Sequence, residues 1–145
     1  MQLISNMYPQ MSEKEIRSYW GKLSGPLLDR IDMYVETARV DLDKLQSTGK
    51  GEGSESIRKK VERARKIQEK RFRNREYSFN AEMPASDIES FCALGKEEKH
   101  LMELAYRNLQ LSARTYHRVL KVARTITDLD GCDCIKKQHI AEALA

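Results

Sequence analysis

Apolar residues recur every three or four positions along most of the chain after residue 53, a spacing that places them on one side of an α-helix. This pattern predicts a long helix from Ser54 to about Glu76, with Ser54 as its N-cap. The apolar stripe is narrow, and the other positions are almost wholly charged. Its members are Ile57, Val61, Ala64, Gln68 and Phe72.

Four shorter helices are predicted after this one, because capping or helix-ending residues divide the remaining apolar pattern. They are expected at about 84–92, at 96–109, at 112–129 with Ser112 as cap and Gly131 as end, and from Asp133 or Cys134 onward. The result is a mainly all-α fold, a helical bundle after Gly53. In the last three helices the expected inward residues are Leu101, Leu104, Ala105 and Leu109; Tyr116, Val119, Leu120, Ala123 and Ile126; and Ile135, Ile140, Ala141 and Leu144.

The chain before Gly53 has a different pattern. Ser12 and Glu15 have the spacing of a capping box and predict a short helix over 12–20, which Gly21 ends. Residues 32–36 read as a strand with no partner in the sequence, and a lone strand leaves its backbone groups unpaired. This indicates the end of a larger fold. The glycine-rich stretch 46–53 predicts a flexible linker. We therefore expect two parts, 1–53 and 54–145.

Length and composition place the chain among globular proteins. Its 145 residues suffice for one domain with a core, and 40% of them are hydrophobic. No apolar run approaches the roughly 20 residues that cross a bilayer. The first residues lack the basic patch and apolar stretch of a secretory signal, so a cytoplasmic protein is expected.

Positive charge is concentrated in the first helix of the bundle. Residues 54–76 hold ten Lys and Arg against four Glu, a net charge of +6, which leaves −2 for the rest of the chain. Such a surface is either a solvated, charge-paired face or a surface that neutralises nucleic-acid phosphates. Phe72, Tyr77 and Phe79 could stack on bases, but packing on the bundle is favoured. The candidate nucleic-acid residues are Arg58, Lys59, Arg63, Lys66, Lys70 and Arg73.

The motifs of self-contained enzymes are missing from the sequence. It has no G-x-x-x-x-G-K-[ST] phosphate-binding loop, no G-x-S-x-G and no H-E-x-x-H. Three cysteines argue against a disulfide framework. Cys132 and Cys134 lie near His139, but zinc sites need four ligands and favour C-x2-C spacing, so reduced thiols in a turn and no metal are expected.

Four stretches, in order, carry a family resemblance. The first is K-L-S-G-P-L-L-D-R-I-D at 22–32, the second joins Glu55-Ser56 with R-K-K-V at 58–61 and A-R-K-I-Q at 64–68, the third is 111–129, and the fourth is H-I-A-E-A at 139–143. Together they resemble the magnesium-chelatase-like AAA+ ATPases of the ComM/YifB type over 19–145. The resemblance implies that 1–53 is the tail end of an AAA+ core plus a linker. It also implies that 54–145 is the C-terminal helical lid with the sensor-2 helix.

The resemblance also implies roles for two arginines. Arg30 matches the arginine finger in L-D-R-I-D, and Arg114 matches the ATP-contacting sensor-2 arginine in S-A-R. A guanidinium aimed at the γ-phosphate stabilises the charge that phosphoryl transfer spreads over its oxygens. The residues alone leave alternatives open. Arg30 could simply pair with Asp29 or Asp32, and an exposed Arg114 is tolerated in a first helical turn although it opposes the helix dipole.

The resemblance further implies a longer parent protein that binds ATP and Mg²⁺ and assembles into a ring, usually a hexamer, through contacts with its own AAA+ core and with other copies. The chain alone is expected to bind neither cofactor tightly and to hydrolyse no ATP. DNA is the expected substrate, as in a recombination or competence helicase, and no membrane partner is expected. The alternative is a free-standing helical DNA-binding or adaptor domain, although the sequence shows no helix-turn-helix signal.

Overall fold

The computed structural model describes residues 51–145 and, of the preceding part, Ser12, Lys14, Glu15, Ser18, Gly21, Arg30, Ile31, Met33 and Val35. Two compact units make up the chain, Met1–Gly51 and Glu52–Ala145. The predicted roles of 1–53 and 54–145 stay predictions.

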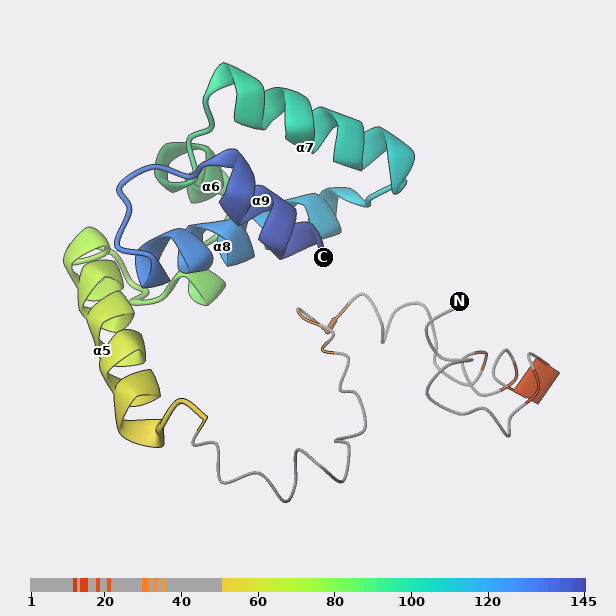
Figure 1. Cartoon of the computed structure of the whole chain (residues 1–145). Coiled ribbons are helices and arrows are strands. Elements are labelled where there is room, and N and C mark those ends of the chain that lie inside the picture. The colour runs from red at the N-terminus through yellow and green to blue at the C-terminus, as the bar shows by residue number, and fades with distance from the viewer. Residues whose placement is uncertain are drawn as a thin grey trace. The chain divides into compact units, whose positions relative to one another are not determined.

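The second unit is a bundle of α-helices (Figure 1). A one-turn 3-10 helix, η1, connects the first helix to the second. The helical bundle predicted after Gly53 is thereby confirmed. The elements are α5 (Ser54–Arg71), η1 (Asn80–Glu82), α6 (Ala85–Phe91), α7 (Lys96–Asn108), α8 (Ala113–Leu129) and α9 (Lys137–Leu144).

Local capping explains where α8 begins and ends. The Ser112 hydroxyl accepts a hydrogen bond from the Thr115 N–H at 3.1 Å, as the sequence predicts. Gly131 follows the end of the helix with φ of +68°, the left-handed conformation that glycine adopts without a Cβ penalty.

The predicted bounds of α5 and α9 need correction. Gly53, not Ser54, is the N-cap of α5, and the helix ends at Arg71 rather than near Glu76. The last helix starts at Lys137, later than expected, because the Lys136 N–H donates to His139 Nδ1 at 3.0 Å and so fixes Lys136 as the N-cap.

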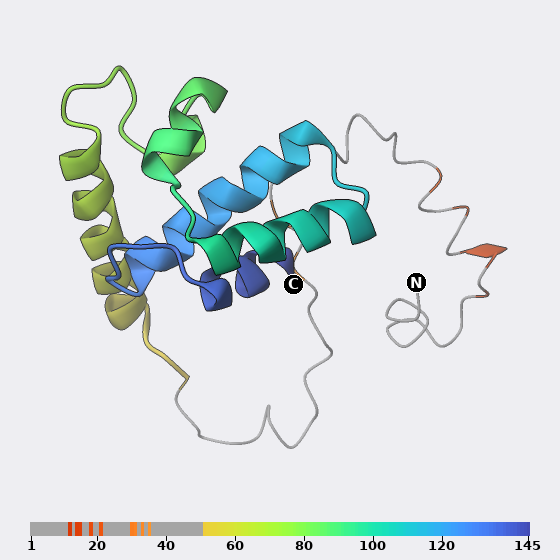
Figure 2. The same ribbon diagram turned by 90° about the horizontal axis from the view of Figure 1, so that it is seen from above.

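Helix α8 is the centre of the bundle. It packs against α5, η1, α6 and α9, and α7 packs against α9. Figure 2 shows α5 crossing one end of α8, the end at which the chain turns toward α9. The helix that carries the predicted sensor-2 arginine is therefore held by most of the other elements of this unit.

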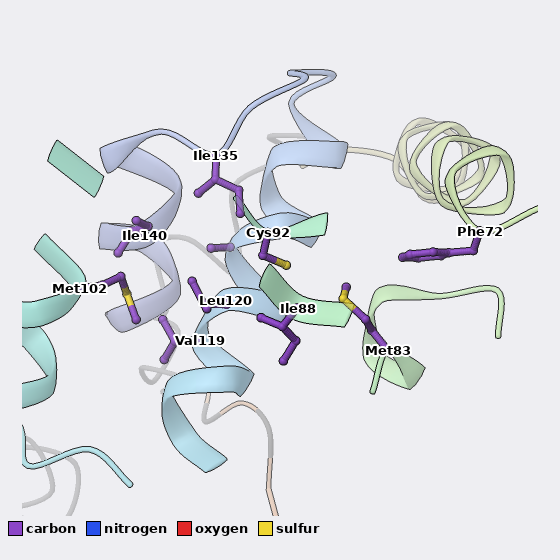
Figure 3. Packing of buried hydrophobic residues seen from close by; sticks show 10 residues of the cluster. Phe72, Met83, Ile88, Cys92, Met102, Val119, Leu120, Ile135 and Ile140 are labelled. Carbon is purple, nitrogen blue, oxygen red and sulfur yellow. The ribbon is translucent and has the colours of Figure 1, made fainter. Parts of the chain in front are cut away.

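A single apolar cluster fills the space between these helices (Figure 3). Its contributors come from α5's end, the following loop, α6, α7, α8, and the α9 region. Several were predicted from helical spacing, whereas Met83, Ile88, Cys92 and Met102 were not. The cluster consists of Phe72, Met83, Ile88, Cys92, Met102, Val119, Leu120, Ala123, Ile135 and Ile140.

Four large apolar residues predicted to face inward are exposed. Ile57 and Val61 are 48% and 43% exposed because α5 is buried only in its later part, at Ala64 and beyond. On α7, Met102 and Ala105 face inward, which turns Leu104 and Leu109 outward, at 44% and 57% exposure. Ala141 of α9 is exposed as well.

The described residues of the leading segment confirm one prediction and contradict another. The Ser12 N–H donates to Glu15 Oε2 at 2.8 Å and the Glu15 N–H donates to Ser12 Oγ at 3.3 Å, which is the predicted capping box. Met33 and Val35 lie in neither helix nor strand, so the predicted strand is wrong at these positions. A strand exists only where a neighbour completes its hydrogen-bond ladder. Residues 46–50 of the predicted linker lie outside the described residues.

Truncation of α7 side chains tests which face of this helix is buried. Met102→Ala is expected to lower the free energy of unfolding by about 2–5 kcal/mol, because Met102 is fully buried and the substitution leaves a cavity. Leu104→Ala, two residues further along the same helix and on its exposed side, is expected to cost less than about 1 kcal/mol. Urea unfolding of both variants is the measurement, and equal losses would contradict this packing.

Candidate functional site

Arg114 lies in the first turn of α8 and is exposed. The Ser112 cap fixes the backbone of that turn, so the position from which the guanidinium extends is well defined. The structure therefore leaves this arginine available for a ligand at the start of the central helix.

Arg30 belongs to the other compact unit, where it is exposed and lies in a turn. Asp29 and Asp32, its alternative ion-pair partners, lie outside the described residues. The arginine-finger role stays a prediction, as does the sensor-2 role of Arg114.

The most elaborate polar cluster of the second unit surrounds Asp128, a residue that sequence reasoning missed. Asp128 is completely buried near the end of α8. Arg71 of α5 donates from Nη1 to Oδ2 at 2.8 Å and from Nη2 to Oδ1. Arg124, one turn earlier in α8, donates to Oδ1 from Nε at 3.2 Å and from Nη2 at 2.9 Å. The Asn80 side-chain amide of η1 donates to Oδ2 at 2.9 Å.

The groups that bind Asp128 also bind one another and the backbone. Arg71 Nη1 donates to Asn80 Oδ1 at 3.0 Å, and the Asn80 N–H donates to Gln68 Oε1 at 3.0 Å. Arg124 donates to the carbonyl oxygens of Cys132 and Asp133 at 3.3 and 2.8 Å. This network joins α5, η1, α8 and the loop that leads to α9. It also explains why Gln68, a polar residue, is buried within an apolar stripe.

Electrostatics keep the Asp128 carboxylate ionised. Burial raises the pKa of Asp128, but hydrogen bonds from Arg71, Asn80 and Arg124 outweigh it and hold the pKa below its ordinary value. Two guanidinium groups share this single carboxylate, so Arg71 and Arg124 are occupied in a structural role. The only local signal for this in the sequence is the Arg124–Asp128 spacing of four.

His139 is fully buried, and its side chain accepts a hydrogen bond from the backbone at the N-terminus of α9. The Lys136 backbone N–H can only donate, so His139 Nδ1 accepts this bond at 3.0 Å. Nε2 then carries the hydrogen and faces Asp130 Oδ2 at 3.2 Å. Thr127 Oγ1 also contacts Nδ1, at 2.9 Å. This histidine is thus engaged in joining α8 to α9.

The three cysteines are free thiols. Cys92 is buried among apolar side chains, and that burial raises the pKa of its thiol to about 11. Cys132 is half-buried and Cys134 is exposed. Within residues 51–145 and the few described residues before them, no three His, Cys, Asp or Glu side chains gather as metal ligands would.

The structure brings four of the six candidate nucleic-acid residues together. A shallow hollow of about 420 Å³ runs along α5, and Glu62 and Ile67 line it beside four basic residues. Arg58 is not among these lining residues, and Arg73 lies beyond the end of α5. The four that share the hollow are Lys59, Arg63, Lys66 and Lys70.

The aromatic residues near α5 pack on the bundle, as favoured from the sequence. The Phe72 ring is buried, with the Tyr77 ring 4.8 Å and the Phe91 ring 5.0 Å from it, centroid to centroid. The Arg65 guanidinium lies over the Phe79 ring at 5.2 Å. Stacking of these rings on nucleic-acid bases is therefore not supported.

No helix in the described part of the chain combines the length and apolar character that crossing a bilayer requires.

The fold and its polar core define the class of the second unit, Glu52–Ala145, as an all-α bundle built around one central helix. Residues 51–145 match the family described as magnesium chelatase, subunit ChlI C-terminal, and residues 4–45 match magnesium chelatase, subunit ChlI. The chain therefore belongs to the magnesium chelatase ChlI family. The second match also extends the likeness upstream of Tyr19, where the sequence resemblance was expected to begin.

Individual relatives agree with this assignment. The chain is 42% identical to competence protein ComM of Haemophilus influenzae over 134 residues, 92% of this chain and 26% of that protein. It is 38% identical to the uncharacterized protein YifB of Escherichia coli, over 88% of this chain and 24% of YifB. The uncharacterized protein Rv2897c of Mycobacterium tuberculosis is 32% identical, over 89% of this chain and 25% of its own length. The chain thus spans about a quarter of these relatives.

Removal of the Asp128 charge tests the polar network. Asp128→Asn is expected to lower the free energy of unfolding by about 3–5 kcal/mol at pH 7, because it leaves the buried Arg124 and the half-buried Arg71 without their carboxylate. Asp133→Asn is the matched control, since only the backbone carbonyl of Asp133 joins the network and its side chain is exposed.

The loss should depend on pH in a defined direction. Because the folded pKa of Asp128 is lowered, its stabilisation is present above the ordinary carboxyl pKa of about 3.9 and is lost as pH falls through the folded value. Urea unfolding of the wild type and of Asp128→Asn from pH 7 to pH 3 should therefore show the difference between their free energies of unfolding becoming smaller toward the acid end. A constant difference across this range would contradict an ionised Asp128.

Proposed function

We propose that this chain is the C-terminal part of an AAA+ ATPase ring motor, in which the helical unit is the lid over the bound nucleotide. The observation that carries the proposal is the exposed Arg114 at the capped start of α8, in a chain of the magnesium chelatase ChlI family. In this role Arg114 is the sensor-2 residue and contacts the phosphates of ATP–Mg²⁺.

The physical setting suits a phosphate ligand. The first turn of α8 presents backbone N–H groups and the positive end of the helix dipole, and both favour an anion. One of these N–H groups is taken by the Ser112 cap, but a guanidinium beside the others adds a full positive charge. The positive charge of Arg114 is repelled by the positive end of its own helix dipole, and a bound phosphate would neutralise this repulsion.

Arg30 is proposed as the arginine finger. It belongs to the unit that precedes the helical domain, and in a hexameric ring of the family pattern it would reach the ATP of a neighbouring copy. An exposed arginine is compatible with this contact. ATP and Mg²⁺ are then cofactors of the longer protein, whose remaining AAA+ core supplies the phosphate-binding loop.

The substrate of the motor is proposed to be DNA, and its location the cytoplasm. The likeness to a protein named for competence supports DNA as the substrate. The alternative, a free-standing DNA-binding or adaptor domain, gives neither Arg30 nor Arg114 a role.

Substitution of the two arginines in the longer protein tests this function. Arg114→Ala and Arg30→Ala are each expected to lower ATP turnover at least about 10-fold without unfolding the protein, because both side chains are exposed and act on developing charge. Arg107→Ala, an exposed arginine of α7, is the control that should turn over ATP like the wild type.

Mixing experiments separate the two roles. A ring of Arg30→Ala subunits mixed with subunits that lack the lysine of the phosphate-binding loop should recover activity, if the finger works across the interface between copies. Wild-type turnover by both single variants would contradict the proposed function.

A further inference from the structure

One side of α5 carries a continuous row of cations. Lys59, Arg63, Lys66 and Lys70 follow one another at intervals of four, three and four residues. At 3.6 residues per turn these four positions fall within about 60° of the helix circumference and extend over about 16 Å of its axis. We call these four residues the α5 ridge; their side chains stand at the edge of the shallow hollow along this helix.

The ridge lies on a different side of α5 from the residues that are buried against the bundle. Ala64 and Gln68, the buried residues of α5, lie on the opposite side of the helix by the same geometry. All four ridge residues are exposed. Lys59, Lys66 and Lys70 therefore lie outside the buried face of α5, whereas Arg63 also bonds the end of α8.

The charge of the ridge is only partly compensated, since Glu62 is the one carboxylate among the residues that line the hollow beside the four cations. Lys59 is 3.5 Å from Glu55, but both side chains are more than 70% exposed, and such pairs are weak. Arg63 donates to the carbonyl oxygen of Leu129 at 3.0 Å, which orients the guanidinium without neutralising it. Arg71 on the same helix contrasts with these residues, because Asp128 compensates its charge.

We propose that the α5 ridge binds the sugar–phosphate backbone of duplex DNA. Duplex DNA carries about one charge per 1.7 Å of axis, so roughly ten phosphates lie within the length of the ridge and each cation can find one. Phosphates fix position without reading sequence, so this contact is independent of sequence. The inference rests on the proposed function for DNA as the partner, and it deepens that function by naming the contact surface.

Salt dependence of binding by the 145-residue chain tests the ridge. Four phosphate contacts give a slope of about −3.6 in log affinity against log salt, so affinity for a labelled duplex should fall roughly 150-fold between 50 and 200 mM salt. The triple variant Lys59→Gln, Lys66→Gln and Lys70→Gln should keep one contact, with a slope of about −0.9 and a fall of about 3.5-fold. Arg63 is left in place because it also bonds the end of α8.

A matched variant controls for net charge. Lys60→Gln, Lys99→Gln and Arg107→Gln remove the same number of charges, all from exposed positions outside the ridge and outside the candidate nucleic-acid residues. This variant should keep a slope close to that of the wild type, and circular dichroism should show all three proteins equally helical.

Three outcomes would overturn the inference. Equal reductions of slope in both triple variants would show that binding follows net charge rather than the ridge, and undetectable binding by the wild type at 50 mM salt would show that the ridge does not bind DNA. A ridge variant that keeps DNA affinity but loses self-association would assign the ridge to an acidic surface of another copy. Each outcome leaves the ATPase test of Arg114 unaffected, so failure of the ridge is distinct from failure of the proposed function.

Discussion

The ion pair between Arg71 and Asp128 is the interaction on which the arrangement of the helical unit depends. These residues are 57 positions apart in the sequence, yet Nη1 and Nη2 of Arg71 each donate a hydrogen bond to the Asp128 carboxylate. A buried carboxylate without such partners is strongly unfavourable. Asp128 of α8 is therefore stable in its buried position only when α5 packs against α8 and brings Arg71 to it. Arg124 and Asn80 complete the site and bring the loop to α9 and η1 to the same point.

This anchor at one end of α5 explains the character of the other end. Only the later part of α5 is held on α8, and the earlier part extends away from the bundle (Figure 1). Ile57 and Val61 are consequently exposed, and the α5 ridge lies on a different side of the helix from the buried Ala64 and Gln68. The same anchor secures α8, whose other end carries Arg114. The α5 ridge and the start of α8 at Arg114 therefore both belong to helices that the buried Asp128 carboxylate holds in place.

Much of this fold could be predicted because its signals are local. Ser112 and Gly131 bound α8 through contacts within a few residues, and the Ser12–Glu15 capping box is equally short-range. The rotation of α7 was less predictable, since Leu and Met are similarly apolar and only packing selects Met102 over Leu104. The strand at 32–36 was wrong at Met33 and Val35 because strand formation depends on a partner.

The candidate site was predicted only in part, because its tertiary contacts leave little local signal in the sequence. Arg114 came from a family resemblance, because nothing in the helical pattern separates it from other exposed arginines. The Asp128 network escaped prediction because Arg71 looks like one more cation on a basic helix until tertiary contact reveals its partner. The six candidate nucleic-acid residues contained the four ridge residues, but the end of α5 at Arg71, which excludes Arg73, became clear only from the structure.

A double-mutant cycle between Arg71 and Asp128 tests the central claim most directly. Arg71→Met, which keeps an unbranched apolar side chain, and Asp128→Asn are compared singly and together by urea unfolding. If this pair joins α5 to α8, the losses in unfolding free energy should be non-additive by about 1–3 kcal/mol, with the double variant more stable than the sum of the single losses predicts. Additive losses, within about 0.5 kcal/mol, would contradict the claim that this interaction holds the two helices together.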